Sequence, residues 1–121
     1  MSEEVRQELL KGGVVDITTK GRRTGEARRI EIRIHNIDGE IYLTGQPGPR
    51  GWHANLLATP DFRLHFKGEL VADLDAHATP VTGDEEKRRI HRAILENIGR
   101  IEQLEERMKS SPLVHLTVNI D

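Results

Sequence analysis

Hydrophobic and polar residues alternate along much of this chain with a period of two, the pattern of β-strands that bury one face. In residues 29–34 every second residue is isoleucine and the residues between are charged. In residues 62–66 Phe and Leu alternate with Arg and His. Together with less regular hydrophobic runs, this pattern predicts six strands, at residues 14–18, 29–34, 40–44, 62–66, 70–78 and 113–120.

Hydrophobic residues at helical spacing predict helices in the segments between. Residues 2–11 begin with acidic residues and are followed by a Gly-Gly pair, which favour a helix start and a helix stop. Residues 52–58 are expected to form a short helix that ends before Pro60, because the residue before a proline avoids the helical region.

The longest helical pattern lies between residues 82 and 111. Thr82 and Glu85 have the spacing of a capping box. A stripe of hydrophobic residues follows, and Gly99 is expected to break or kink the helix. We expect this stripe to pack in the core; its members are Ile90, Ile94, Ile98, Ile101, Leu104 and Met108.

Short turns connect most of the predicted strands, so neighbouring strands are expected to run antiparallel. Asp38-Gly39 is a strong hairpin signal, and Lys67-Gly68-Glu69 is a second turn. Closing such hairpins into a small barrel, or curling them strongly, protects the edge strands. The predicted class is α+β, mainly β: one domain spanning residues 1–121, with about six mostly antiparallel strands and flanking helices.

The composition argues against several classes of protein. The 121 residues include no cysteine, which rules out disulfides and thiolate chemistry. No apolar run approaches the roughly 20 residues of a membrane-spanning helix, and residues 1–4 lack the features of a signal peptide. We therefore expect a cytoplasmic protein with no integral membrane association. The net charge of −2 argues against a nucleic-acid partner.

The charge is unevenly distributed, because basic residues gather around one turn. Residues 20–35 contain six basic and two acidic residues, a local balance of +4. Four arginines lie in or beside the turn that two glycines bracket: Arg22, Arg23, Arg28 and Arg29. This segment is either a solvated basic hairpin or a site for an anionic ligand, and the residues alone leave both open.

A second loop, residues 44–55, offers glycines, backbone N–H groups, Trp52 and Asn55 at the start of a predicted helix. If both loops face one cleft, arginines on one wall would hold phosphate or carboxylate, and Trp52 would fix a planar ring. That combination suits a nucleotide-like or flavin-like cofactor. The alternatives are that Trp52 is a core anchor and that Asn55 caps a turn.

Other chemistry finds little support in the sequence. None of the six histidines lies two or four residues from another, so we expect no metal site. The serines are Ser2, Ser110 and Ser111, and none stands in a Gly-x-Ser-x-Gly elbow. Residues 45–48 are not followed by the Gly-Lys-Ser/Thr of a P-loop.

The two loops carry a resemblance to a known family. Residues 18–25 (Thr-Thr-Lys-Gly-Arg-Arg-Thr-Gly) with Arg28, the turn Asp38-Gly39, and residues 51–60 (Gly-Trp-His-Ala-Asn-Leu-Leu-Ala-Thr-Pro) resemble the deazaflavin-dependent nitroreductase and quinone reductase family in order and spacing. The resemblance extends over residues 14–120. It implies a split β-barrel that binds coenzyme F420, an 8-hydroxy-5-deazaflavin.

The resemblance also implies which residues bind the cofactor. The tail of that coenzyme carries a phosphodiester and glutamate carboxylates, which arginines would match. The implied cofactor-binding residues are Arg22, Arg23, Thr24, Gly25, Arg28, Arg29, Ile30, Glu31, Ile32, Thr44, Gly45, Gln46, Pro47, Gly51, Trp52 and Asn55. No catalytic side chain is implied.

The chain departs from the family pattern at three places. Family members often have Pro at the position of Glu31 and Ser-Lys at the position of Gln46-Pro47. The tyrosine-rich segment that some members place over the substrate is absent, since residues 90–111 hold no aromatic residue. The resemblance therefore implies a cofactor and leaves the substrate open.

The expected function is that of an oxidoreductase passing a hydride from reduced F420 to an electron-poor small molecule, such as a quinone, nitro compound or activated enone. One alternative keeps the fold and replaces the cofactor by FMN. Another is a non-catalytic module that binds a deazaflavin, haem or lipid, or docks an acidic partner through the basic hairpin. The expected partner is a small-molecule electron acceptor, and the protein is a monomer or homodimer.

Overall fold

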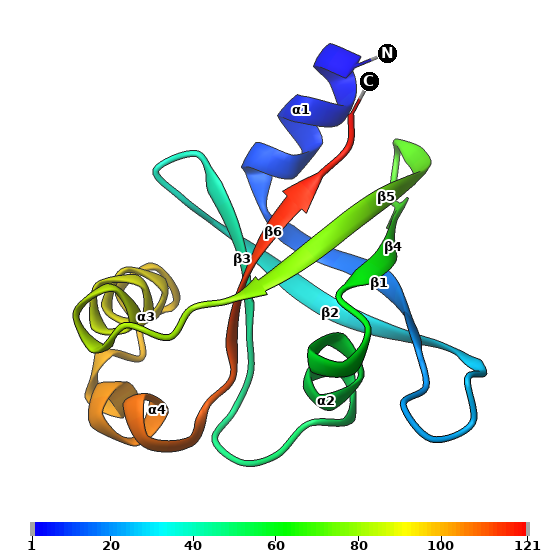
Figure 1. The fold of residues 1–121 in the computed structure, drawn as a ribbon. Helices are drawn as coiled ribbons and strands as arrows, with labels where there is room; N and C mark the ends of the chain where they lie inside the picture. The colour runs from blue at the N-terminus through cyan, green and yellow to red at the C-terminus, as the bar shows by residue number, and fades with distance from the viewer. Residues whose placement is uncertain (1, 121) are drawn as a thin grey trace.

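The computed structural model describes residues 2–120, which form six strands and four α-helices (Figure 1). The helices are α1 (Ser2–Lys11), α2 (Gly51–Ala58), α3 (Asp84–Ile98) and α4 (Leu104–Ser110), with a 3-10 turn, η1 (Ile101–Gln103), before the last. The strands are β1 (Gly13–Lys20), β2 (Ala27–Ile37), β3 (Glu40–Thr44), β4 (Asp61–Lys67), β5 (Val71–Pro80) and β6 (Leu113–Val118). All six predicted strands are present, close to their predicted bounds.

The strands close into an antiparallel barrel in the order β1-β2-β3-β6-β5-β4. Closure depends on a short pairing of β1 with β4 and on β6, which lies between β3 and β5. The β2–β3 hairpin turns at Asp38 and Gly39, whose φ angles of 54° and 87° match the positive values of a type I′ turn. The predicted class, α+β with a mainly β barrel, is confirmed.

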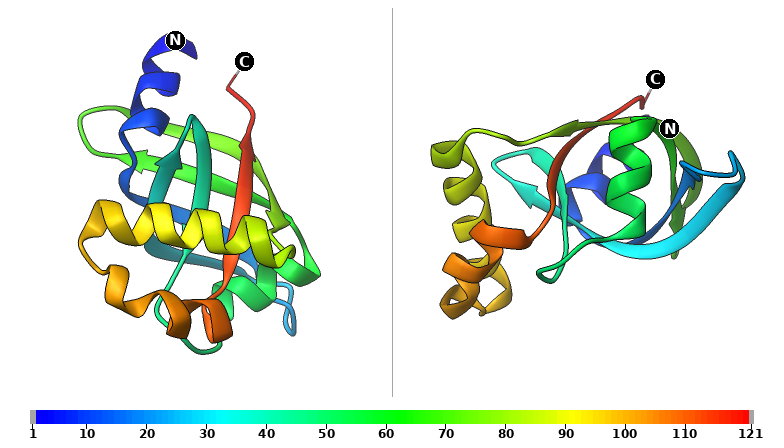
Figure 2. Two further views of the ribbon diagram at one scale, coloured as in Figure 1. Left: turned by 90° about the vertical axis from the view of Figure 1, so that its left-hand side faces the viewer. Right: turned by 60° about the horizontal axis from the view of Figure 1, so that its bottom comes forward.

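The barrel interior holds the hydrophobic core. Strand alternation turns every second residue inward, and Ile17, Ile34, Leu43 and Leu64 are at most 1% exposed. Helix α1 stands at one end of the barrel, and α2 lies across the opposite end (Figures 1 and 2). These helices add Val5, Leu9 and Leu56 to the core.

Helix α3 covers part of the outer face of the barrel (Figure 2). Ile90 and Ile94 are fully buried there and form a second hydrophobic cluster with strand residues. Its other members are Ile37, Tyr42, Val81 and Leu113. The first half of the predicted isoleucine stripe therefore packs in a core.

Two expectations for this helical segment are wrong. Helix α3 begins after Gly83, which makes no side-chain cap, so Thr82 and Glu85 do not form a capping box. Ile98 and Ile101 are each 41% exposed, so the stripe is not buried throughout. The reason is Gly99, which ends α3 in the left-handed conformation and turns the chain, so that helical spacing no longer refers to one face.

His91 of α3 is a buried histidine with no hydrogen-bond partner on either ring nitrogen. Burial, and next the charges of Lys87 and Arg107, lower the pKa of His91 to about 4. Its imidazole is therefore neutral in the folded protein near neutral pH. In the unfolded chain the same group takes up a proton below its ordinary pKa of 6.5.

We predict that His91→Leu makes the protein more resistant to acid. Because the folded-state pKa is depressed, the stabilisation from a neutral His91 is present above pH 6.5 and is lost as the pH falls through about 4. The shift corresponds to about 3 kcal/mol. Urea unfolding across this range should show a smaller loss of unfolding free energy in His91→Leu than in the unaltered protein. Asn97→Ala, at an exposed position of the same helix, is the control; identical pH profiles for all three proteins would refute the assignment.

Candidate functional site

The basic turn, residues 21–26, is held by its own backbone. Gly21 N–H donates to the carbonyl of Glu26 (2.8 Å), and Gly25 N–H donates to the carbonyl of Gly21 (2.9 Å). Gly25 has a φ of 76°, which favours glycine. A β-carbon on Gly21 would lie 3.1 Å from the Glu26 oxygen. The two glycines therefore allow the tight turn that carries Arg22 and Arg23.

Asn55 of α2 joins this turn to the second loop. Its side-chain oxygen accepts hydrogen bonds from the backbone N–H and from Nη1 of Arg22, both at 3.1 Å. Its side-chain nitrogen donates to Oγ1 of Thr19 at 3.1 Å. Asn55 is only 6% exposed, so water cannot easily replace these partners. The two loops meet, and Asn55 has the turn-capping role that the sequence left open.

A pocket of about 330 Å³ lies where the turn, the start of β2 and the start of α2 converge. Arginines form one wall and Trp52 another. Trp52 also packs against the barrel core, so it is both a core contact and a pocket wall. We call this space the turn pocket; it is lined by Thr19, Gly21, Arg22, Arg23, Thr24, Arg28, Ile30, Gly51, Trp52 and Asn55. Eight of the sixteen residues implied by the resemblance are among them.

Three more of the implied residues, Thr44, Gly45 and Gln46, line a second pocket of about 580 Å³. This outer pocket also contains residues that the sequence analysis did not select, namely Arg33, His35, Ile98, Arg100 and Arg107. Arg33 and His35 are the outward members of the β2 alternation, so the pattern could have indicated them. The two arginines near α4 carry no such signal, because only the fold brings them to β2.

Gly45 lies between the two pockets. A β-carbon built on Gly45 would be 3.9 Å from Cζ2 of Trp52, which lines the turn pocket. The Gly45 carbonyl accepts a hydrogen bond from Nη1 of Arg107 (2.9 Å), which lines the outer pocket. One glycine is thus in contact with a wall of each pocket.

The end of β3 and the loop after it are attached to residues 107–112 at three points. Besides the Arg107 contact, Gly48 N–H donates to the carbonyl of Ser110 (3.0 Å). The hydroxyl of Thr44, which is 7% exposed, donates to the carbonyl of Pro112 (2.6 Å). These bonds hold the wall between the pockets against α4 and the segment that follows it.

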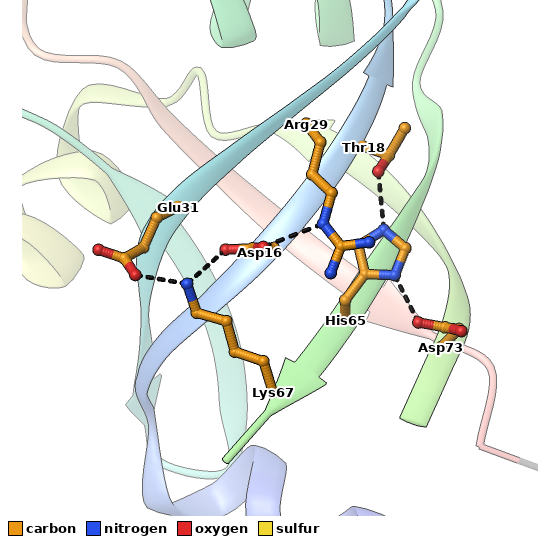
Figure 3. A network of polar contacts seen from close by, with 7 residues as sticks. All are labelled: Asp16, Thr18, Arg29, Glu31, His65, Lys67 and Asp73. Atoms are coloured by element: carbon orange, nitrogen blue, oxygen red, sulfur yellow. Dashed lines mark hydrogen bonds and ion pairs between the residues drawn. The ribbon is translucent and has the colours of Figure 1, made fainter. Parts of the chain in front are cut away.

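Arg29 and Glu31 lie on the other face of β2, in a polar network on the outside of the barrel (Figure 3). Arg29 Nε donates to Asp16 Oδ2 (2.9 Å), and Lys67 Nζ bridges Asp16 Oδ1 (2.7 Å) and Glu31. Hydrogen bonds from Lys67 first and Arg29 second lower the pKa of Asp16. Neither Arg29 nor Glu31 lines the turn pocket, because successive residues of a strand point to opposite faces and Arg28 and Ile30 face the pocket.

The same network contains a buried histidine between two strands (Figure 3). Asp73 accepts a hydrogen bond from His65 Nδ1 (2.6 Å), so in the neutral ring Nε2 accepts one from the Thr18 hydroxyl (2.7 Å). None of the three lines the turn or outer pocket. These bonds connect β1, β4 and β5 where the barrel closes.

The remaining implied residues, Gly25, Ile32 and Pro47, line neither pocket. Gly25 shapes the turn, and Ile32 packs against the barrel core. No cluster of three or more His, Cys, Asp or Glu side chains suited to a metal ion occurs among residues 2–120. Within the same residues, no helix has the length and apolar character needed to cross a bilayer.

An antiparallel barrel with helices at its ends and a basic pocket beside one of them defines a protein of the split-barrel class. A family model described as F420H(2)-dependent quinone reductase matches residues 2–118. The chain therefore belongs to the F420H2-dependent quinone reductase family and is an oxidoreductase. The family named from the sequence motifs is thereby confirmed.

Solved structures show the same fold at low sequence identity. A conserved hypothetical protein, Rv2991 from Mycobacterium tuberculosis, matches with a TM-score of 0.75 and 16% identity, over 98% of this chain and 81% of that one. A putative pyridoxamine 5'-phosphate oxidase from Listeria innocua matches with 0.71 and 11%, over 98% and 93%. An F420-H2 dependent reductase, FDR-A, matches with 0.60 and 22%, over 86% and 93%. A search of curated proteins found no significant match.

We predict that Asn55→Ala loosens the basic turn without unfolding the barrel. The variant leaves the Arg22 N–H without its acceptor and should lower the unfolding free energy by about 1–3 kcal/mol. Hydrogen exchange followed by NMR should show faster exchange at Arg22. Asn97→Ala, at an exposed position of α3, is the control. Unchanged exchange at Arg22 in Asn55→Ala would show that the side chain does not hold the turn.

Proposed function

We propose that this protein binds F420 in the turn pocket and transfers a hydride from the reduced cofactor to an electron-poor small molecule, such as a quinone, nitro compound or activated enone. The observation that carries the proposal is the convergence of Arg22, Arg23 and Arg28 with Trp52 in one pocket. Family membership and the similarity to FDR-A support the choice of cofactor.

The donors of the turn pocket fit an anionic cofactor tail. The only ion pair involving these arginines within residues 2–120 is Arg28 with Glu26, at a distant 3.9 Å. Arg22 bonds the neutral amide of Asn55, which leaves its charge uncompensated. Guanidinium groups in this state can bind phosphate or carboxylate oxygens in a bidentate manner. The residues present therefore suit a phosphodiester with carboxylates beyond it.

The other wall suits a planar ring. Trp52 and Ile30 offer apolar surface beside the arginines. When bound, F420 supplies the hydride chemistry, and the chain's own residues bind the cofactor, orient it and exclude water. The lining of the turn pocket includes no Asp, Glu or His, so we expect the proton that completes the reduction to come from solvent.

Three further possibilities follow from the same fold. FMN is the alternative cofactor, since its phosphate would meet the same arginines. A non-catalytic role in holding a cofactor or another ligand is the second. The third concerns assembly: one similar structure is described as a domain-swapped dimer, and either a monomer or a homodimer is compatible with the pocket, which one chain forms.

We predict that replacing Arg22 and Arg23 together by Ala weakens the binding of reduced F420 about ten- to a hundredfold, because each removes a charge-assisted contact. Screening by salt should shrink the difference between variant and unaltered protein. Quenching of Trp52, the only tryptophan, provides the titration signal. Arg92→Ala, which removes an exposed charge on α3, should titrate like the unaltered protein. Equal affinity in the double variant would remove the basic turn from the site.

We further predict that F420 is bound at least about tenfold more tightly than FMN, and that the F420 complex turns over with a panel of quinones, nitro compounds and enones. Parallel titrations of both cofactors test the first part, and cofactor oxidation followed by absorbance tests the second. Tighter binding of FMN would favour the alternative cofactor. Tight F420 binding without turnover on any acceptor would favour the non-catalytic role.

A further inference from the structure

The outer pocket concentrates positive charge without acidic groups. Its lining includes Arg33 from β2, Arg100 after α3 and Arg107 from α4, and it contains no Asp or Glu. Arg33 is far in the sequence from the other two, and they come together because α3 packs beside β2 and α4 packs against α3 (Figure 2). Arginines that only interact with water do not need to share one cavity, so their grouping here indicates an anion site.

Arg107 is the most unusual of the three, because its guanidinium is buried without a carboxylate. The residue is 4% exposed. Its hydrogen-bond partners among residues 2–120 are neutral: Nη1 donates to the Gly45 carbonyl (2.9 Å), while Nε (3.2 Å) and Nη2 (3.0 Å) donate to Oε1 of Gln103. Burial, and next Arg50, lower the pKa of Arg107, but an arginine remains charged near neutral pH. A buried charge with neutral partners is stabilised when an anion approaches it.

Arg33 and Arg100 are also without acidic partners. Within residues 2–120, the arginines that form ion pairs are Arg28, Arg29, Arg63, Arg88 and Arg89. Both Arg33 and Arg100 line the pocket and are exposed, so they can reorient towards a ligand. An arriving anion therefore does not have to displace a protein carboxylate.

The environment of this pocket changes the pKa of His35. Burial first, then the charges of Arg33 and Arg107, lower the pKa of His35 to about 4. The imidazole is therefore neutral near neutral pH and can offer one N–H donor without adding charge. The remaining charges in the lining are those of the three arginines.

We propose that the outer pocket is an anion-binding site that holds a carboxylate of the electron acceptor. The assignment of the anion to the acceptor rests on the proposed function, which places the cofactor in the turn pocket. The two pockets are neighbours, since only Gly45 lies between the outer pocket and the Trp52 wall of the turn pocket. An acceptor anchored here has its electron-poor group beside the cofactor pocket. The preferred substrates are thus quinones, nitro compounds or enones that carry a carboxylate.

Direct anion binding tests the site without any cofactor. The full-length chain is titrated with succinate and with inorganic phosphate, and the ring signals of His35 are followed by NMR. We expect saturable shifts in the unaltered protein and in Arg92→Gln. In the double variant Arg33→Gln with Arg100→Gln, binding should weaken at least about tenfold, since charge-assisted hydrogen bonds are lost. These two exposed arginines are chosen because Arg107 helps to hold the β3–α2 loop. No shift in the unaltered protein, or equal shifts in the double variant, would overturn the site.

Steady-state kinetics test the acceptor assignment. A quinone bearing a carboxylate is compared with its methyl ester, with reduced F420 as donor. In the unaltered protein the acid should have a KM at least about tenfold lower than the ester, and the double variant should abolish this preference while changing the KM of the ester less than about twofold.

The outcomes separate the possible sources of the anion. If the double variant weakens F420 binding and leaves the acid-to-ester ratio unchanged, the pocket holds the cofactor's own tail, and the acceptor assignment is wrong. If F420 does not bind at all, the proposed function fails, and the NMR titration still decides whether the pocket binds anions. An acid-to-ester ratio near one in the unaltered protein overturns the proposed substrate class.

Discussion

The carboxamide of Asn55 is the interaction on which the arrangement of the site depends. The arginines of the basic turn repel one another, and without Asn55 this turn at the barrel end would be free to move into solvent. Asn55 bonds both the backbone and the guanidinium of Arg22 and, through Thr19, the strand that leads into the turn. Because it is buried, these bonds do not compete with water. Helix α2 thereby positions the charge of the turn relative to Trp52 on its own first turn.

The two-residue period of the strands divides the charges of β2 between two tasks. Arg28 faces the turn pocket, while Arg29 forms an ion pair with Asp16 on the outer face. Farther along, Arg33 and His35 again face outward, and there they line the outer pocket together with Ile98 of α3 and Arg107 of α4. Strand β2 thus supplies cations to the turn pocket, to the polar network on the outside of the barrel and to the outer pocket. The elements that pack beside each part of the strand determine which role a side chain has.

Local signals were sufficient for the strands and the hairpin at Asp38-Gly39, because turn chemistry and strand period depend on neighbouring residues. They left open whether the two loops meet, which depends on the tertiary contacts of Asn55 with Arg22 and Thr19. The resemblance implied Arg29 and Glu31 as cofactor-binding residues, and the alternation of strand faces places them on the outer face of the barrel, where they pair with Asp16 and Lys67. The role of Arg107 could not be predicted, because its contact with Gly45 spans 62 residues and requires α4 to pack beside β3. The break at Gly99 was predicted and is confirmed, but helical spacing alone did not show that Ile98 and Ile101 are exposed beside it.

The attachment of the β3–α2 loop to residues 107–112 has a consequence for the order in which the molecule can assemble. During synthesis, the basic turn and its contacts with Asn55 emerge early, because they involve only residues 19–55. The residues that hydrogen-bond to the wall around Gly45, namely Arg107, Ser110 and Pro112, are translated later, and the barrel itself closes only with β6. The cation-rich turn is therefore translated well before residues 107–112, which hold the wall that separates the two pockets.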